Sequence, residues 1–223
     1  MVVSVLRSAA AHVLVDDVAT PALADEQAHH VFRVLRVRDG DDVTVTDGHG
    51  RWRACRAVGN DIEPVAAPET VTRREHQLTV GFAIPKQDRP EWIVQKLTEI
   101  GIDRVVLLVA ERSVVKWPAD RAAKHLAKLR RVADAALQQS RGVWLPTIEG
   151  PVTASDFLPA AVIAEPGAPP ISGADTAVAI GPEGGWTDRE LERAAATVSI
   201  GANVLRVETA VIVVATRLSM HAE

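Results

Sequence analysis

The chain has 223 residues, of which 47% are hydrophobic, so it can bury a sizeable core in one large domain or two small ones. It contains no apolar run of about 18 residues, and its N-terminal stretch lacks the basic leader of a signal peptide, so we expect a soluble protein of the cytoplasm. Cys55 is the single cysteine, which excludes an internal disulfide and a thiolate zinc cluster.

The formal net charge of −4 argues against a protein that is basic all over, but the charge is unevenly distributed. Residues 71–150 carry 14 Lys and Arg against 9 Asp and Glu. Screening confines the field of a charge to about 8–10 Å at cellular salt, so a locally basic surface can bind a polyanion although the total is acidic. The same side chains could also form a solvated helix face, and charge alone does not decide between the two.

The first 70 residues alternate short apolar runs with turn signals. In "DVTVTDG" the valines Val43 and Val45 alternate with threonines, which is the period of a half-buried strand, and an Asp-Gly turn follows. Only "DEQAHHVFRVLR" reads as a helix. We therefore predict a small, mostly β domain over residues 1–70, with its boundary in the Pro-bearing stretch 60–74.

The remaining chain has a different pattern. "LTVGFAI" and "RVVLLVA" are typical of buried strands, and the helix "RPEWIVQKLTEIG" between them has Pro90 in its first turn and Gly101 at its end. A long helix follows Pro118, short strands are expected at "AVIAE", "TAVAIG" and "NVLRV", and two further helices begin at Thr187 and after "NVLRV". Strands without alternation that are separated by helices indicate a parallel sheet covered on both faces, so residues 71–223 are predicted to form an α/β domain.

The stretch "AIGPEGGWTDRELE" places three glycines directly after a strand, and Thr187 and Glu190 then form a capping box that starts a helix. Glycines let main-chain groups meet a ligand directly, and ligands of open α/β sheets lie beyond the carboxyl ends of the strands. The loop matches neither a phosphate-binding P-loop nor the G-x-G-x-x-G pattern. Glu183 would repel phosphate, which favours a ligand with cationic or hydroxyl groups, although a purely structural turn remains an alternative.

Two other groups of residues could bind a ligand or could have an ordinary structural role. Arg206 and Glu208 in "NVLRVETA" lie at a strand-to-helix junction, where an acid is also favoured by the helix dipole alone. His29 and His30 are adjacent, so on a helix they point about 100° apart and are poorly placed to chelate one metal. No nucleophile-elbow pattern accompanies the histidines, and no metal site is expected.

Five separated segments, in this order along the chain, carry a family resemblance: "HHVFRVLRVRDGDDVTVTDGHG", "KQDRPEWIVQKLTEIGIDRVVLLVAERSVVKW", "ADAALQQSRGVWLP", "AIGPEGGWTDRELE" and "NVLRVETA". Together they resemble the SPOUT-class RNA methyltransferases, and among these the RsmE-type enzymes that methylate N3 of a uridine in 16S (small-subunit) ribosomal RNA. The resemblance implies a PUA-like β-barrel over residues 1–70 and a SPOUT α/β domain with a deep trefoil knot over residues 71–223. It also implies S-adenosyl-L-methionine as cofactor, the small ribosomal subunit as partner, and a homodimer with its active site at the interface.

The same resemblance assigns site residues. The cofactor-binding set would be Glu165, Pro166, Gly167, Ile180, Gly181, Pro182, Glu183, Gly184, Gly185, Ile200, Gly201, Val204, Leu205 and Arg206. In the catalytic pair, Arg206 would stabilise charge that develops on the uracil oxygens, and Glu208 would accept the N3 proton or orient Arg206. Phosphate contacts are expected from Arg33, Arg36, Arg112 and Arg141.

Three departures from the family pattern stand out. The N-terminus lacks the common aromatic start, Gly142 stands where relatives often have a basic residue, and Val207 stands where threonine is frequent. Two alternative functions follow from the same features. A non-catalytic RNA-binding or ribosome-assembly protein would share the basic region, whereas a nicotinamide oxidoreductase would need a complete glycine fingerprint, which this sequence lacks.

Overall fold

The computed structural model describes residues 2–222, which form two compact units. One unit contains the chain up to Arg73 together with Asp134–Leu145, and the other contains Arg74–Ala133 and the chain from Pro146 onward. We expected a single boundary near residue 70. The additional segment belongs to the first unit because the end of helix α4 (Ala119–Ser140) and the residues after it bond to that unit's strands. The Leu14 amide donates to Gln138 Oε1 (3.2 Å), and the Gly50 amide donates to the Val143 carbonyl (2.7 Å).

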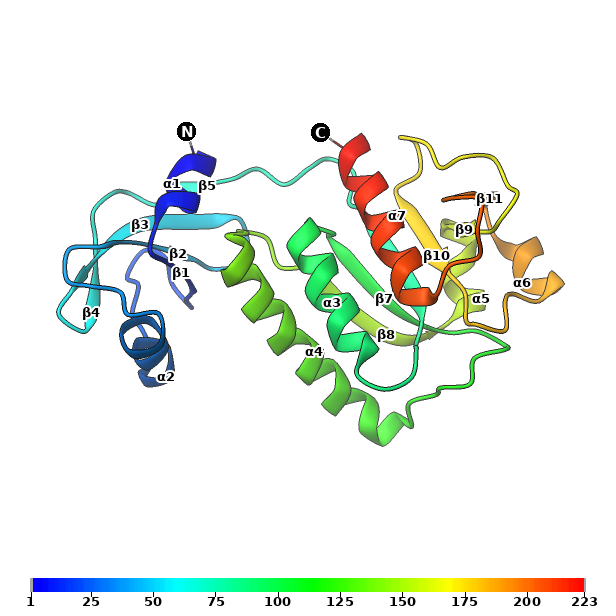
Figure 1. Cartoon of the computed structure of the whole chain (residues 1–223), viewed down its shortest axis with the longest axis horizontal. Helices are drawn as coiled ribbons and strands as arrows, with labels where there is room; N and C mark the ends of the chain where they lie inside the picture. The colour runs from blue at the N-terminus through cyan, green and yellow to red at the C-terminus, as the bar shows by residue number, and fades with distance from the viewer. Residues whose placement is uncertain (1, 223) are drawn as a thin grey trace. The chain divides into compact units, whose positions relative to one another are not determined.

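The first unit is built around a small sheet in the order β1 (Ala11–Leu14), β2 (Asp42–Thr46), β3 (Arg51–Val58), β4 (Asp61–Pro64), with β5 (Glu69–Thr70) also on β3 (Figure 1). Strands β1 and β2 are parallel, and the other pairs are antiparallel. Helix α2 (Asp25–His29) continues into a π-helical turn, η1 (His30–Val34). The mostly β domain with one central helical segment is thus confirmed, whereas helix α1 (Val2–Ser8) was not predicted.

Strand β2 is buried on both faces, although its alternation predicted a half-buried strand. Val43 and Val45 pack into the apolar core with Cys55, while Thr44 and Thr46 are also fully buried. Their hydroxyls are satisfied inside the unit, because Thr46 Oγ1 donates to the Arg51 carbonyl (2.8 Å) and Thr44 Oγ1 lies 2.8 Å from the His12 ring. Threonine in an alternating pattern therefore does not mark a solvent face when such partners are available.

His12 connects β1 to the segment that follows α4. Its side chain is 4% exposed, with Nδ1 2.8 Å from Thr44 Oγ1 and Nε2 2.8 Å from the Gly142 carbonyl. A carbonyl can only accept, so Nε2 carries the proton and Nδ1 accepts from the threonine hydroxyl. Burial lowers the pKa of His12 to about 4, against the opposing effect of the bond to Gly142 and with a smaller contribution from the charge of Arg141.

The second unit is a six-stranded parallel sheet in the order β11 (Ala196–Val198), β9 (Val162–Ala164), β10 (Ala177–Ile180), β6 (Thr79–Ala83), β7 (Arg104–Val109), β8 (Thr147–Thr153). Helices α3 (Arg89–Ile100) and α7 (Val207–His221) lie side by side on one face (Figure 1). The other face is covered by α5 (Ala154–Phe157), the 3₁₀ turn η2 (Leu158–Ala160) and α6 (Asp188–Arg193). The predicted α/β domain with a parallel sheet is confirmed, and the knot stays a prediction.

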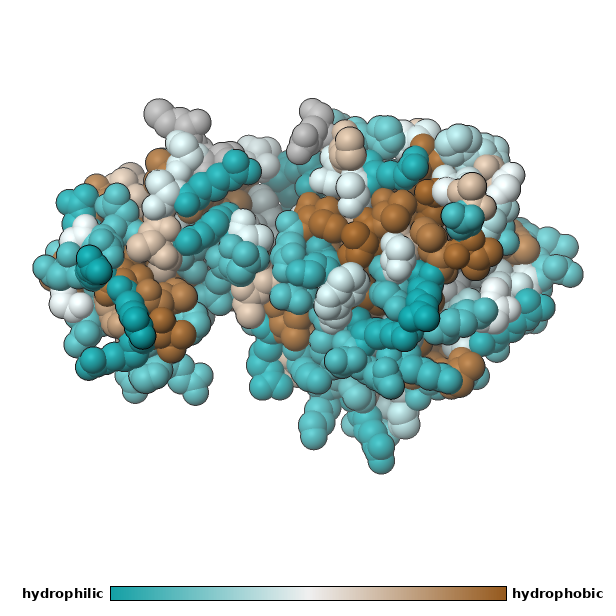
Figure 2. Space-filling model, viewed as in Figure 1, coloured by the Kyte–Doolittle hydropathy of each residue, from teal (hydrophilic) through white to brown (hydrophobic). Residues whose placement is uncertain are grey.

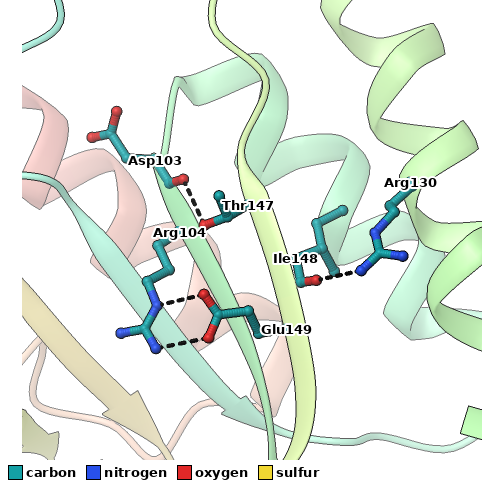
Figure 3. Close-up of polar contacts among 6 residues, drawn as sticks. All are labelled: Asp103, Arg104, Arg130, Thr147, Ile148 and Glu149. Atoms are coloured by element: carbon teal, nitrogen blue, oxygen red, sulfur yellow. Dashed lines mark hydrogen bonds and ion pairs between the residues drawn. The ribbon is translucent and has the colours of Figure 1, made fainter. Parts of the chain in front are cut away.

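At the amino ends of β7 and β8, side chains hold the edge strand β8 in register (Figure 3). Arg104 donates through Nε (2.9 Å) and Nη2 (2.8 Å) to the two carboxylate oxygens of Glu149, and the Thr147 amide donates to the Asp103 carbonyl (2.9 Å). From α4, Arg130 Nη2 donates to the Ile148 carbonyl (3.3 Å). The hydrogen bonds and charge of Arg104 lower the pKa of Glu149, but both side chains are about 40% exposed, so the pair contributes only modestly to stability.

Two strand predictions differ from the structure. "NVLRV" is not a strand: residues 199–206 form a loop whose Val204 is 86% exposed, and Val207 already belongs to α7. The sixth strand is instead β11, which precedes this loop and pairs with β9. Strand β8, with its Gly-Pro sequence, was not predicted because those residues usually mark turns.

Within residues 2–222, none of the helices combines the length and apolar composition that crossing a membrane requires.

The His12 geometry predicts an acid-sensitive fold. The folded-state pKa lies below that of an unfolded histidine, so the unfolded chain binds the proton first and stability is lost as the pH falls from about 6.5 to about 4. Over that window we expect His12 to remove about 3 kcal/mol of unfolding free energy. Urea unfolding at a series of pH values should show a shallower acid dependence for His12→Gln than for the parent. The exposed-site control His49→Gln should follow the parent, and equal slopes for all three proteins would contradict the assignment.

Candidate active site

A cavity lies in the second unit where β9 and β10 end. Three loops surround it: residues 165–168 after β9, residues 181–187 after β10, and residues 199–206 after β11. The first turn of α7 closes it with Val207 and Ala210. This is the position at which open parallel sheets bind ligands, and the loop with three glycines forms one wall.

The glycines of the loop after β10 make room for Trp186. A Cβ at Gly181 would lie 2.8 Å from the Trp186 ring, so a larger residue there would displace the indole, which is buried against the core and also lines the cavity. Gly185 has a φ of +70°, and its amide donates to the Pro182 carbonyl (2.9 Å), which closes a tight turn. The loop therefore serves two purposes: it turns sharply, and it seats an aromatic ring beneath the cavity.

Arg112, in the loop after β7, holds this glycine loop from the side. Its Nη1 donates to the carbonyls of Gly184 (3.2 Å) and Trp186 (2.9 Å). A Cβ on Gly184 would lie 3.3 Å from Arg112 Cβ, so Gly184 faces Arg112 and does not line the cavity. We expected Arg112 to contact phosphate and Gly184 to contact the cofactor. In the structure, the two residues contact each other.

Glu190 ties the same loop to the end of β7. It is 1% exposed; its Oε2 accepts from the Thr187 amide (3.0 Å) and its Oε1 accepts from the Glu111 amide (2.9 Å). The Glu190 amide in turn donates to Thr187 Oγ1 (3.3 Å), which confirms the predicted capping box. A buried carboxylate is stable here because main-chain amides satisfy both of its oxygens.

The loop after β11 is the least enclosed wall. Ser199 Oγ donates to the Gly201 carbonyl (3.1 Å), and a Cβ at Gly201 would have no neighbour within 4 Å. Val204 is 86% exposed although it borders the cavity. The start of this loop is anchored, because the Ser199 amide donates to the Pro169 carbonyl (2.6 Å) and its carbonyl accepts from the Ile171 amide (3.1 Å), whereas residues 201–204 are exposed and form the part of the wall that can move most easily.

Most of the predicted cofactor residues come together around this cavity. All of them line it except Gly167, Gly184 and Arg206. The cavity also has five lining residues that the sequence analysis missed: Ala164, Trp186, Asn203, Val207 and Ala210. Trp186 directly follows Gly185, and Val207 and Ala210 follow the third loop. Their closeness in sequence to the two motifs could therefore have identified them as lining residues.

The two predicted catalytic residues flank the start of α7. Arg206 is its exposed N-cap residue, and within residues 2–222 its side chain forms no ion pair with Glu208. Glu208 Oε1 instead lies 3.5 Å from Arg89 Nη1 of α3, and Glu208 Oε2 is buried without a hydrogen-bond partner in the described part of the chain. Arg89 was missed because nothing in the sequence indicates that α3 and α7 are neighbours.

The remaining predicted RNA contacts lie in the first unit. Arg33 and Arg36 are exposed, and Arg36 has a φ of 59°. Arg141, directly after α4, has a φ of 62° and is partly buried. In the part of the chain that is described, no group of three or more histidine, cysteine or acidic side chains is arranged to hold a metal ion.

The contacts of Arg112 predict that its removal loosens the glycine loop. Arg112→Ala deletes hydrogen bonds to two carbonyls, which we expect to cost about 1–3 kcal/mol of local stability. Hydrogen exchange followed by mass spectrometry should show faster exchange in residues 181–187 and unchanged protection in β6 and β7. Arg189→Ala, an exposed arginine of α6, is the matched control. Equal protection of the loop in both variants would contradict the bracing role.

Comparisons with known proteins agree with this architecture. Residues 72–219 match the family described as an RNA methyltransferase domain, and residues 23–56 match the one described as an RNA methyltransferase PUA domain. The ribosomal RNA small subunit methyltransferase E of Synechocystis sp. is 33% identical over 219 residues, which cover 86% of this chain and 70% of that protein.

Solved structures give the same picture. A probable rRNA-methyltransferase from Porphyromonas gingivalis is 28% identical, with a TM-score of 0.75 over 95% of this chain and 98% of its own. The ribosomal RNA small subunit methyltransferase E from Neisseria gonorrhoeae, solved bound to S-adenosyl methionine, shares the fold at 24% identity, with a TM-score of 0.79 over 94% of this chain and 97% of its own. With a PUA domain ahead of an RNA methyltransferase domain and a relative aligned over most of both chains, this protein belongs to the ribosomal RNA small subunit methyltransferase E (RsmE) family of SPOUT-class RNA methyltransferases.

Proposed function

We propose that this protein transfers a methyl group from S-adenosyl-L-methionine to N3 of a uridine in 16S ribosomal RNA. The observation that carries the proposal is the cavity beyond the carboxyl ends of β9 and β10, bordered by three glycine-bearing loops. Membership in a family of small-subunit rRNA methyltransferases supports the reaction class. The Neisseria relative of the same fold binds this cofactor.

The lining of the cavity fits the proposed cofactor. Ile180, Leu205 and the Trp186 ring offer apolar surface for an adenine, and the loop main chain offers donors and acceptors for its edge. Glu165 and Glu183 also line the cavity, and carboxylates suit a sulfonium cation where they would repel a phosphate. When bound, the cofactor supplies an electrophilic methyl group.

The cavity is smaller than the proposed ligand requires. Its volume is about 200 Å³, whereas pockets for such ligands span roughly 300–1,000 Å³. The loop of residues 199–206 is hydrogen-bonded to the loop after β9 at Ser199, but its residues 201–204 are exposed. We therefore propose that this loop moves outward when the cofactor enters.

Arg206 and Glu208 are the proposed catalytic residues. Uridine N3 must lose its proton to be methylated, and the resulting negative charge spreads onto O2 and O4. The Arg206 guanidinium is exposed next to the cavity wall formed by Leu205 and is proposed to stabilise that charge. Glu208 is the proposed proton acceptor, and Arg89, whose Nη1 lies 3.5 Å from Glu208 Oε1, holds its carboxylate in place.

Apolar surface around α7 supports the homodimer that the family resemblance implied. Figure 2 shows a continuous hydrophobic area over α7 and the adjoining part of the second unit. Trp92 of α3 (45% exposed), Val204 (86%) and Met220 of α7 (72%) contribute exposed hydrophobic side chains in these elements. Large exposed apolar patches mark interaction sites, and a second copy of the chain would cover them beside the cavity.

RNA contacts are proposed for Arg33, Arg36 and Arg141 of the first unit, whose charges would meet phosphates of the small-subunit RNA. Ribosomes place that substrate in the cytoplasm, which is where we propose the protein acts. A non-catalytic RNA-binding role would use the same basic residues, so only cofactor binding and methyl transfer distinguish the two functions.

Gly201→Val tests the placement of the cofactor. Gly201 lines the cavity and has open space around it, so the new side chain should occupy the ligand's position and weaken S-adenosyl-L-methionine binding at least about 10-fold, with the fold intact. Titration calorimetry measures the affinity. Gly173→Val, at an exposed glycine outside the cavity, is the control and should bind like the parent. If the folded parent does not bind S-adenosyl-L-methionine, the proposed enzyme function is wrong. If Gly201→Val binds it with the affinity of the parent, the cofactor site lies elsewhere.

Arg206→Ala tests the chemical step. We expect a fall of about 100-fold in the turnover number with little change in cofactor affinity, because the guanidinium acts on charge that forms only in the transition state. The assay measures methyl transfer to small ribosomal subunits, with 3-methyluridine identified in nuclease digests by mass spectrometry. Arg189→Ala serves as the control. Formation of a different methylated nucleoside would refute the N3 assignment, and undiminished turnover would remove Arg206 from the mechanism.

A further inference from the structure

A second cavity, of about 610 Å³, lies entirely within the first unit. It is bounded by β1, by the α2–η1 segment and by the C-terminal end of α4. Its volume falls within the roughly 300–1,000 Å³ of small-ligand pockets. Apart from the phosphate contact proposed for Arg141, none of the roles assigned so far uses this space.

The floor of this cavity is apolar and rigid. Ala11, Val13 and Val31 line it, and each is at most 3% exposed and part of the unit's core. His12, also in the wall, is fixed by its two hydrogen bonds to Thr44 and Gly142. A flat ring could lie against these side chains without any rearrangement of the core.

Two amide side chains in the wall are held in place through the main chain of Leu14. Gln138 Oε1 accepts from the Leu14 amide (3.2 Å), and Gln27 Nε2 donates to the Leu14 carbonyl (2.6 Å). Each amide nitrogen carries two protons, and each donates one of them within the unit, Gln138 Nε2 to the Asp134 carbonyl (3.2 Å). Within residues 2–222 the second proton of each forms no hydrogen bond. Donors fixed in this way are preorganised, so they can recognise the edge of a planar ligand at low entropic cost.

Arg141 gives the strongest indication of a missing partner. Its side chain lines the cavity, and its Nη1 is buried without a hydrogen-bond partner within residues 2–222. Burial lowers the pKa of Arg141, which reflects the cost of holding the charge out of water. Its backbone is also in the left-handed region, at φ 62°. A buried, unpaired donor on a strained backbone is unfavourable unless a ligand acceptor satisfies it.

The rim offers groups that are not committed to the fold. His30 and Gln139 line the cavity and are exposed, and neither side chain takes part in a hydrogen bond or ion pair within the described chain. Leu35, which is 49% exposed, also lines the cavity. Arg33 and Arg36, both exposed, follow His30 on the same segment, and Glu26 adds an acidic side chain to the lining.

We propose that this cavity holds an unpaired nucleobase of the RNA substrate, a subsite separate from the cofactor cavity of the second unit. The inference rests on the proposed RNA substrate. A phosphate alone would leave the apolar floor uncovered, whereas a base fills it, presents its polar edge to the amides and gives Arg141 a carbonyl or phosphate oxygen. Single-stranded bases are the usual targets of RNA recognition, and an exposed imidazole such as His30 can stack on one.

The experiment compares a fluorescent 12-nucleotide single-stranded RNA with a 12-base-pair RNA duplex, each titrated into the full chain and followed by anisotropy. The double variant His30→Ala, Gln139→Ala alters only uncommitted rim side chains. We expect it to bind the single strand about 10-fold more weakly and the duplex as the parent does. His29→Ala changes an exposed neighbour that does not line the cavity and should bind both like the parent.

Photocrosslinking locates the base directly. RNA that carries 4-thiouridine should crosslink to peptides containing His30 or Gln139, as identified by mass spectrometry, and the double variant should lose these crosslinks. Equal loss of single-strand and duplex binding, unchanged binding, or crosslinks confined to the second unit would each overturn the subsite. Calorimetry with S-adenosyl-L-methionine on the same proteins keeps this test separate, because failure of the methyltransferase function would abolish cofactor binding in the parent without changing the RNA results.

Discussion

The contact between Gly181 and the Trp186 ring is the constraint on which the active site depends. The indole can lie beneath the cavity only because residue 181 has no side chain, since a Cβ there would lie 2.8 Å from the ring. The chain also turns sharply just before the buried Trp186, and Gly185 permits this turn because its φ is positive. Arg112 and Glu190 then fix the reversed chain from outside the cavity, through main-chain carbonyls and amides. The wall that faces the cavity then consists of main-chain atoms, apolar side chains and the Glu183 side chain.

The three walls of the cavity differ in rigidity, and the difference bears on function. The loop after β10 is held by the side chains of Arg112 and Glu190, whereas the loop after β11 is hydrogen-bonded to the loop after β9 at Ser199 and leaves residues 201–204 exposed. A rigid wall can define the position of a cofactor, while a loosely held one can admit it. Arg206 ends the loose wall and begins α7, so movement of that loop on ligand entry would also position the proposed catalytic guanidinium.

The sequence predicted those helices and strands whose ends and type are set by residues close together in the chain. Pro90 and Gly101 mark the ends of α3, Thr187 and Glu190 form their capping box, and the unalternating strands indicated a parallel sheet. The errors arose where contacts between residues far apart in the sequence determine the structure. The end of α4 joins the first unit through Gln138 and Gly142, and "NVLRV" has strand-forming residues but no neighbouring strand to pair with. Most of the proposed cofactor residues surround one cavity because they follow adjacent strands, but the partner of Glu208 depends on the packing of α3 against α7, which no motif encodes.

The first unit shows why polar residues in an alternating strand cannot be assigned to solvent by pattern alone. His12 donates its Nε2 proton to the Gly142 carbonyl, so its Nδ1 accepts a hydrogen bond. The hydroxyl of the buried Thr44 donates that bond. The bond to Gly142 brings residues 141 and 142 to β1, and Arg141 is thereby placed on the cavity wall with a strained backbone and a buried unpaired nitrogen. Desolvation is the largest cause of the lowered pKa of His12 and the charge of Arg141 adds to it, so a neutral imidazole lies beside the guanidinium. Structure and the proposed base recognition therefore depend on the same histidine, since a protonated His12 would repel Arg141 and disturb the wall that is proposed to bind RNA.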